Sequence, residues 1–244
     1  MIELFFAPTP NGWKISVLLE ELQVPYRVTP VSLSQGGQYA PEFLALSPNN
    51  KIPAIIDHAP KQGTAICVFE SGAILLYLAE KYGRFLPSDL AGRYTTVQWL
   101  MWQMSGLGPM LGQHGHFLLY SQEQVPYALD RFRNEAKRLY GVLDRRLKET
   151  GRFIAGDEYT IADMACFPWV MTHKAQKFDP AEFPNVKRWF TELRGRPALQ
   201  RGLAVGRDSI GPRAEMSADM RRKLYGLSPQ DETAAAPAAA TPKG

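Results

Sequence analysis

The amino-acid sequence predicts a mixed α/β domain followed by an all-helical domain. Short runs of strand-forming residues alternate with helical patterns only before about residue 70. Beyond that point, apolar residues recur at helical spacing. Because helices that follow a small α/β unit favour two domains, we expect the first domain at 1–83, a linker at 84–90 and a helical domain at 91–205.

The first half contains four predicted strands, each a short apolar or β-branched run bounded by turn-forming residues: 2–7, 26–33, 54–57 and 65–69. Helical patterns separate or follow them at 13–23, 40–48 and 70–83. Pro8 and Pro10 end the first strand, Pro48 closes the short second helix, and Gly83 is suited to cap the third.

This order, β-α-β-α-β-β-α, resembles a thioredoxin-like fold. The Ile52–Pro53 bond precedes the third strand and is of the kind that adopts the cis form at low cost, in a turn that would leave the backbone of Ile52 facing outward. An extended peptide could pair with that backbone as an extra strand. Glu70 and Ser71 begin the next helix, where free N–H groups and the helix dipole favour a carboxylate. Together these groups suit a small peptide such as glutathione.

The second half contains four helical patterns, at 93–118, 125–151, 159–175 and 184–203. Glycines and a proline interrupt the first of them, at Gly106, Gly108 and Pro109. Thr160 and Asp163 have the spacing of a capping box, which marks the start of the third helix.

The last part of the chain is predicted as a C-terminal extension, 206–244, because the helical periodicity fails there. We expect 206–228 to pack as an ordered arm. The low-complexity run TAAAPAAATPKG indicates disorder for about the last sixteen residues.

Composition excludes several functional classes. The net charge of +4 is scattered, and neither a nucleic-acid motif nor a basic stripe is present. No run of about 18 apolar residues could span a membrane, and the first residues lack the basic region of a signal peptide. Cys67 and Cys166 form no C-x-x-C motif, so the cysteines favour a reducing cytoplasm over a disulfide scaffold. No nucleic-acid or membrane partner is expected.

Three motifs, NKIPAI, FESGAILLYLA and TIAD, resemble those of the cytosolic glutathione transferases, over residues 1–204. FFAPTPNGWKI, GGQY, SPNNKIPAI, QWLMWQMSGLGPMLGQ and PYALDRF are similar to the nu class of bacterial transferases, which is itself similar to the transferase-like domain of the yeast nitrogen regulator. The resemblance implies a thioredoxin-like domain with an all-α domain, a homodimer, and glutathione or its disulfide as cofactor. It also implies a glutathione-dependent disulfide-bond reductase.

The loop after the first strand predicts how the sulfur is handled. Most transferases of this fold place a Tyr, Ser or Cys there, but this loop reads APTPNG, without Tyr, Ser or Cys. Thr9 and Asn11 are therefore the predicted catalytic residues: two donors beside a positive helix end would lower the pKa of the glutathione thiol, and the thiolate is the reactive form. Alternatively, both residues only shape the turn and cap the helix.

The resemblance also implies the residues that bind glutathione: Gln38, Asn50, Lys51, Ile52, Pro53, Glu70, Ser71 and Arg131. Lys51 and Gln38 would contact the glycine carboxylate, while Ile52, held by Pro53, would exchange backbone hydrogen bonds with the cysteinyl unit.

At the other end of the peptide, Glu70 would accept the α-amino group and Ser71 would hold the γ-glutamyl carboxylate. Both could also be plain N-cap residues, and the two roles are compatible. Asn50 could merely shape its loop. Arg131 would reach the site from the partner subunit, or else be an exposed helix charge.

Neither cysteine is predicted to react, because Cys67 and Cys166 both lie in apolar segments and suit small buried hydrophobic positions. The redox sulfur would then come from glutathione. His114 and His116 do not share a helix face and have no third ligand in register, so we predict no metal site and expect them to line an acceptor pocket. The core and pocket wall are expected to include Met101, Trp102, Met104 and Met110.

Three functions are compatible with these patterns. The first is disulfide reduction, in which the glutathione thiolate attacks a disulfide and a second glutathione resolves the mixed disulfide. The second is attack of the same thiolate on carbon or on a thioether, by a conjugating transferase or a thioether lyase. The third is a glutathione-binding module without useful turnover.

Overall fold

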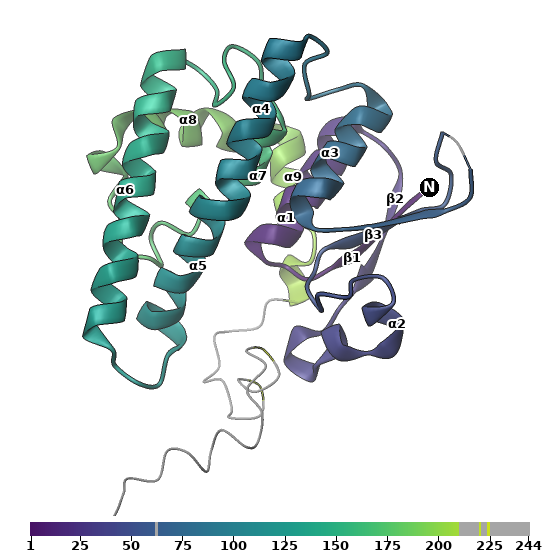
Figure 1. Cartoon of the computed structure of the whole chain (residues 1–244), viewed down its shortest axis with the longest axis horizontal. Coiled ribbons are helices and arrows are strands. Elements are labelled where there is room, and N and C mark those ends of the chain that lie inside the picture. The colour runs from purple at the N-terminus through teal and green to yellow at the C-terminus, as the bar shows by residue number, and fades with distance from the viewer. Residues whose placement is uncertain (62, 210–219, 221–223, 225–244) are drawn as a thin grey trace, which may run out of the picture.

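The computed structural model describes residues 1–61 and 63–209, together with 220 and 224 (Figure 1). The predicted arm at 206–228 and the remainder of the extension to 244 lie almost wholly outside the described residues, so those two expectations stay predictions. Within the described residues, none of the helices is long and apolar enough to cross a membrane.

A four-stranded sheet forms the first half of the molecule. Its strands are β1 (Ile2–Phe6), β2 (Tyr26–Pro30), β3 (Ala54–Asp57) and β4 (Ile66–Phe69), in the order β2-β1-β3-β4. β2 is parallel to β1, whereas β3 is antiparallel to both β1 and β4. This is the order of a thioredoxin-like sheet, so the predicted fold class is confirmed.

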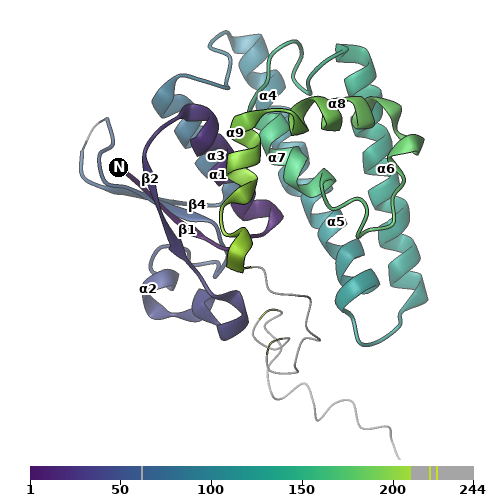
Figure 2. The same cartoon turned by 180° about the vertical axis from the view of Figure 1, so that it is seen from behind.

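Three helices accompany the sheet, namely α1 (Pro10–Leu22), α2 (Pro41–Leu44) and α3 (Ser71–Tyr82), with short 3-10 turns η1 (Leu33–Gln35) and η2 (Gly37–Tyr39) before α2. Figures 1 and 2 show α1 and α3 between the sheet and the helical half, and α2 on the opposite face of the sheet. α3 ends at Gly83 in the left-handed conformation, as the sequence predicts, and α1 ends at Gln23, which also adopts the left-handed conformation but was not predicted to do so.

The described part of the second half is helical. It contains α4 (Leu90–Trp102), η3 (Gln103–Leu107), α5 (Gly108–Gly115), η4 (His116–Tyr120), α6 (Pro126–Thr150), α7 (Ile161–Val170), η5 (Pro180–Glu182), α8 (Pro184–Arg194), α9 (Pro197–Ala204) and η6 (Arg207–Ser209). The predicted interruption at Gly106, Gly108 and Pro109 is a π-helical turn, η3, that joins α4 to α5 without breaking the helical path.

α1 is the structural link between the halves, because it packs against α3, α7 and α9. Its Ser16 hydroxyl donates to the carbonyl of Gly202 in α9 at 2.7 Å. Gly202 permits this approach: a Cβ there would lie 2.5 Å from Cα of Val17. One apolar core runs through both halves. The division into two domains with a linker at 84–90 stays a prediction.

The capping box of α7 forms as predicted. The Asp163 carboxylate, fully buried, accepts hydrogen bonds from the backbone N–H groups of Thr160 and Ile154, each at 3.0 Å, and from the Trp189 indole at 2.9 Å. The motif therefore starts the helix and also fastens α7 to α8 and to the preceding loop.

The prediction that both cysteines are buried is correct for Cys166 and wrong for Cys67. Cys67 lies on β4, an edge strand whose residues are mostly exposed. An apolar run shows that a strand forms but not whether anything covers it. Partial burial raises the pKa of the Cys67 thiol and full burial raises that of Cys166 well above its usual value, so neither is an activated thiolate.

The expectation of a buried methionine-rich wall is wrong for Met101, which is 45% exposed on α4. Trp102 and Met110 are partly buried and pack against the core, and Met104 does so while also lining the cavity described below. The solvent-facing side of α4 therefore carries an apolar side chain.

Candidate active site between the two halves

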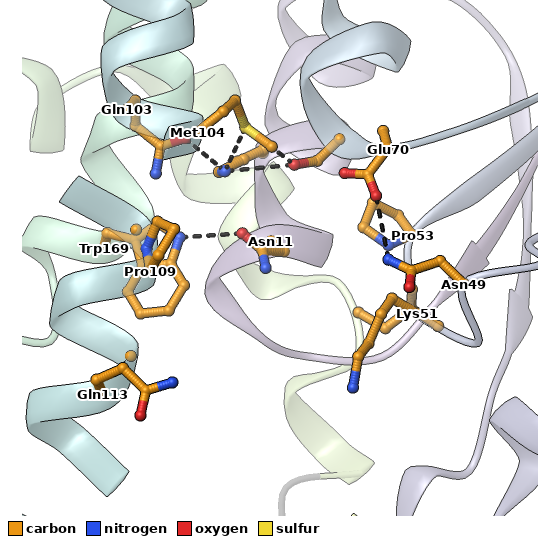
Figure 3. A pocket seen from close by; sticks show the side chains of 15 residues that line it. Asn11, Asn49, Lys51, Pro53, Glu70, Gln103, Met104, Pro109, Gln113 and Trp169 are labelled. Carbon is orange, nitrogen blue, oxygen red and sulfur yellow. Dashed lines mark hydrogen bonds between the residues drawn. The ribbon is translucent and has the colours of Figure 1, made fainter. Parts of the chain in front are cut away.

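A cavity of about 490 Å³ lies between the sheet half and the helical half. The start of α1, the loop before β3 and the start of α3 form one wall, and η3, α5 and α7 form the other. Figure 3 shows this arrangement, with Glu70, Asn49, Lys51 and Pro53 on one side, Gln103, Met104, Pro109, Gln113 and Trp169 on the other, and Asn11 between them.

Six of the ten predicted site residues line this cavity: Asn11, Lys51, Ile52, Pro53, Glu70 and Ser71. The other four, Thr9, Gln38, Asn50 and Arg131, are not in its wall. Gln38 is buried in η2, and Arg131 is exposed on α6. The expected role of Arg131 concerns a partner subunit, and it therefore stays a prediction.

Thr9 is the N-cap of α1, and its hydroxyl oxygen accepts the N–H of Gly12 at 3.2 Å. This is the structural role that the sequence left open for the T-P-N-G loop. Since a hydroxyl can donate while it accepts, the cap leaves the Thr9 hydrogen for another partner.

The loop before β3 presents an open backbone. The Ile52–Pro53 peptide bond is cis. The carbonyl of Lys51 accepts the Ser47 hydroxyl at 2.8 Å, whereas no residue within the described parts of the chain hydrogen-bonds the backbone of Ile52. Asn50 adopts a left-handed backbone with φ of 49° just before it, which supports a role in shaping this loop. An extended ligand could therefore pair with the Ile52 backbone.

The start of α3 combines an acid with a hydroxyl. Glu70 precedes the helix with φ of 68°, and its side chain makes no capping hydrogen bond. Instead its carboxylate accepts the Asn49 amide at 3.3 Å and lies in the cavity wall. Of the two roles that the sequence allowed for Glu70, side-chain capping is therefore absent. Ser71, the first residue of the helix, is buried beside the free N–H groups of its first turn.

Asn11 is held by a tryptophan that the sequence did not single out. The indole Nε1–H of Trp169, on α7, donates to Asn11 Oδ1 at 3.0 Å. Because an indole can only donate, the atom it meets must be the amide oxygen, so the NH₂ group of Asn11 is left for a ligand. Trp169 lies in an apolar helix, and such a pattern indicates core rather than site.

Lys14 is a second residue that the sequence did not reveal. It lies one helical turn after Asn11 and is only 1% exposed. Its ammonium donates to Gln103 Oε1 at 2.7 Å, to Ser71 Oγ at 3.3 Å and to Met104 Sδ at 3.3 Å. Burial lowers the pKa of Lys14 to about 7, partly offset by the electrostatic influence of Cys166 and Glu70.

Two glycines shape the helical wall. A Cβ on Gly108 would lie 2.7 Å from Gln103 Nε2, and one on Gly112 would lie 3.3 Å from the Trp169 ring. These positions therefore leave room for the side chains that contact Lys14 and Asn11.

The expectation that histidines line this cavity is wrong. His114 is buried against Phe178, 5.3 Å between ring centroids, and its Nδ1 lies 3.4 Å from Gln176 Oε1. His116 is not in the cavity wall either, whereas the neighbouring Gln113 is. The π-helical turns on either side of α5 shift which residues face the cavity. In the described residues, no group of three or more His, Cys, Asp or Glu could hold a metal.

Comparisons with known proteins identify the family of the chain. Residues 2–80 match the family model "Glutathione S-transferase, N-terminal domain", and residues 108–197 match "Glutathione S-transferase, C-terminal domain". The disulfide-bond oxidoreductase YfcG of Escherichia coli is 52% identical over 204 residues, which is 83% of this chain and 94% of that protein.

Two solved structures have the same fold. A glutathione transferase from Burkholderia graminis, with two glutathione molecules bound per subunit, superposes with a TM-score of 0.79 at 45% identity over 84% of this chain and 88% of that one. A glutathione transferase from Pseudomonas putida, with one glutathione disulfide per subunit, has a TM-score of 0.78 at 45% identity over 84% and 91%.

Proposed function

The chain belongs to the glutathione S-transferase family, and from that premise we propose that it is a glutathione-dependent disulfide-bond reductase of the nu class. One observation supports a reaction in which glutathione supplies the thiol. The cavity has groups suited to a peptide and an amide donor beside them, yet neither of the two cysteines of the chain lies in its wall. The reacting thiol therefore belongs to glutathione, which acts as the reducing substrate.

The cavity wall supports a distinct role for each end of the peptide. Glu70 accepts the α-amino group, and Ser71 with the first N–H groups of α3 holds the γ-glutamyl carboxylate. The Ile52 backbone pairs with the cysteinyl unit. Lys51, exposed at the rim, attracts the glycine carboxylate. Gln38, Asn50 and Arg131 stay predicted contributors.

The thiolate is stabilised by the NH₂ group of Asn11, the Thr9 hydroxyl and the N-terminus of α1. It attacks one sulfur of the substrate disulfide, forming a mixed disulfide and releasing one thiolate. A second glutathione thiolate attacks the glutathione sulfur of that mixed disulfide and releases the other thiolate. Two glutathiones are thus oxidised to glutathione disulfide while the substrate disulfide is reduced by two electrons. The solved relatives that hold two glutathiones or one glutathione disulfide support this order of reaction steps.

A homodimer completes the proposal. Leu90, Tyr94 and Met101 are 74%, 61% and 45% exposed and recur at helical spacing on α4, so they form one apolar face that suits a second copy of the chain. A cytoplasmic compartment is proposed because the two cysteines lie in separate segments and stay reduced there.

The test is the steady-state reduction of a small symmetrical disulfide by glutathione, coupled to glutathione reductase, with an aryl halide assayed in parallel. We expect rapid disulfide reduction and slow conjugation. Asn11→Ala should lower kcat on the disulfide by about 10- to 100-fold, the loss of a hydrogen bond to a charged group. Preferential turnover of the aryl halide or of a thioether would replace the reductase by a conjugating enzyme or a lyase. Glutathione binding without any turnover would indicate a binding module.

A further inference from the structure

Lys14 is a buried lysine whose amine has no counter-charge in contact. The three acceptors of its ammonium are an amide oxygen, a hydroxyl and a thioether, all of them neutral. No carboxylate lies within salt-bridge distance of Lys14 in the chain as far as the structure describes it. A buried ammonium in neutral surroundings is costly unless an anion is supplied. Lys14 nevertheless lines the cavity, where a ligand could supply one.

The hydroxyl of Ser71 links Lys14 to the ligand side of the cavity. Because an ammonium can only donate, Ser71 Oγ is the acceptor of the 3.3 Å bond from Lys14, so the hydroxyl hydrogen points elsewhere. Its present acceptor is Met104 Sδ at 3.6 Å, a weak one. A carboxylate beside the N-terminus of α3 would be a far stronger acceptor for the same hydrogen.

We propose that Lys14 is a positioning residue for the γ-glutamyl carboxylate: it acts through Ser71, and binding of that carboxylate is coupled to holding Lys14 as an ammonium. The inference rests on the proposed glutathione site. It makes the site selective for peptides whose first residue carries a free α-carboxylate. At the start of α3, Glu70 would then bind the amino group of the ligand's first residue, and Ser71, supported by Lys14 of α1, would bind the carboxylate of the same residue.

The surroundings of Lys14 favour this coupling. The titratable groups that influence it are Glu70 at the start of α3 and the Cys166 thiol of α7, and η3 contributes only neutral Gln103 and Met104. Burial keeps Cys166 a neutral thiol, and Glu70 is directed to Asn49. With the pKa of Lys14 at about 7 before ligand binds, most of it is neutral at pH 8. A bound carboxylate raises that pKa, so binding at pH 8 takes up a proton, whereas binding at pH 6 does not.

The experiment measures proton uptake by calorimetry. S-methylglutathione, which has no thiol to titrate, is bound to the whole protein at pH 8 in two buffers with different ionisation enthalpies. The matched ligand is S-methyl 4-aminobutyryl-cysteinyl-glycine, which lacks only the α-carboxylate. Two matched variants accompany the wild type: Lys14→Met, and Lys148→Met at an exposed position of α6.

We expect the wild type and Lys148→Met to take up protons with S-methylglutathione and to lose that uptake with the matched ligand. Lys14→Met should lose this proton uptake, because the amine that takes up the proton is absent. It should also bind S-methylglutathione about 10- to 100-fold more weakly, the range for a hydrogen bond to a charged group. Its affinity for the matched ligand should change little.

Two results would overturn the inference alone: equal uptake of protons with both ligands in the wild type, or an equal loss of affinity for both ligands in Lys14→Met. The wild-type comparison needs no variant, so it decides the matter even if Lys14→Met fails to fold. If S-methylglutathione does not bind the wild type at all, the proposed glutathione site itself is wrong.

Discussion

Asn11 is held in one orientation by a side chain 158 positions away in the sequence, the indole of Trp169. Without that bond, a terminal amide can rotate and present its oxygen, rather than its NH₂ group, to an anionic sulfur. A thiolate beside an amide oxygen is not stabilised. In the proposed mechanism, the orientation of the Asn11 amide toward the sulfur therefore depends on Trp169.

Trp169→Phe should consequently lower kcat for disulfide reduction by about 3- to 10-fold, the value of one neutral hydrogen bond, with a smaller change in KM for glutathione. Steady-state kinetics with varied glutathione measures both constants. Adding Asn11→Ala to Trp169→Phe should cost little more than Asn11→Ala alone, because the two residues act as a unit. Additive losses in the double variant would show that Trp169 acts independently of Asn11.

Lys14 makes a prediction about stability, because its pKa of about 7 in the folded protein is below the ordinary 10.5. Between these pH values the unfolded chain binds more protons than the folded one, so the stability of the wild type rises with pH there. Below pH 7 the folded protein bears the full cost of burying the charged Lys14. Lys14→Met should therefore raise the free energy of unfolding most at pH 6. This advantage should shrink by up to about 1.4 kcal/mol per pH unit above pH 7.

Urea unfolding of the wild type, Lys14→Met and Lys148→Met at pH 6, 8 and 9 measures this difference. Lys148 is exposed, so its variant should show no such trend. A difference between Lys14→Met and wild type that stays constant over the three pH values would mean that Lys14 does not change its charge in this range.

At the scale of secondary-structure elements, the contact between α1 and α9 holds the cavity wall in place. α1 carries Asn11 and Lys14, and it lies close enough to α9 for a backbone carbonyl there to accept the Ser16 hydroxyl. The end of α9 contributes again, since the Trp13 indole donates to the carbonyl of Val205 at 3.2 Å. A shift of α1 against α9 would move the site residues with it.

Gly202→Ala should destabilise the protein by about 1–3 kcal/mol, because the new methyl group overlaps the α1 backbone at Val17. Gly115→Ala is the matched control, since a Cβ there meets nothing within 4 Å. It should be neutral or stabilising by up to about 1 kcal/mol, as for a helical glycine replaced by alanine. Thermal unfolding compares the two, and equal effects would contradict the close packing of α1 on α9.

At the scale of the whole molecule, the chain is one subunit of the proposed homodimer. The exposed apolar face of α4, formed by Leu90, Tyr94 and Met101, lies outside the cavity wall. A second copy of the chain could cover it, and Arg131 is predicted to act only across such a contact.

Leu90→Glu combined with Tyr94→Glu should abolish the proposed homodimer and leave a monomer, because two charges would then lie in an apolar contact. Sedimentation velocity measures the mass. Lys187→Glu is the control, since Lys187 is exposed on α8, which packs against α6 and α9, and the proposed dimer should persist. A wild-type protein that sediments as a monomer at all concentrations would contradict the assembly and, with it, the role of Arg131.

Much of the molecule could be predicted from sequence because its signals are local. The element order follows from hydrophobic period and turn residues, and the α7 capping box from two residues three positions apart. The loop at Lys51–Pro53 and the start of α3 are likewise contiguous segments, so their place in the cavity wall was accessible from sequence.

The sequence by itself determined the fold class, which follows from hydrophobic periods and turn residues. Its motifs also indicated the family and the segments that line the cavity, because each motif is contiguous. Only the tertiary structure decided that Lys14 donates a hydrogen bond to Ser71 and that Trp169 donates one to Asn11. It also decided that His114 packs against Phe178, outside the cavity wall, and that Cys67 is exposed. These facts depend on which faces meet when helices far apart in sequence pack together. Periodicity identifies the buried face of a helix, but the identity of the side chain across the contact is set by packing of the whole chain.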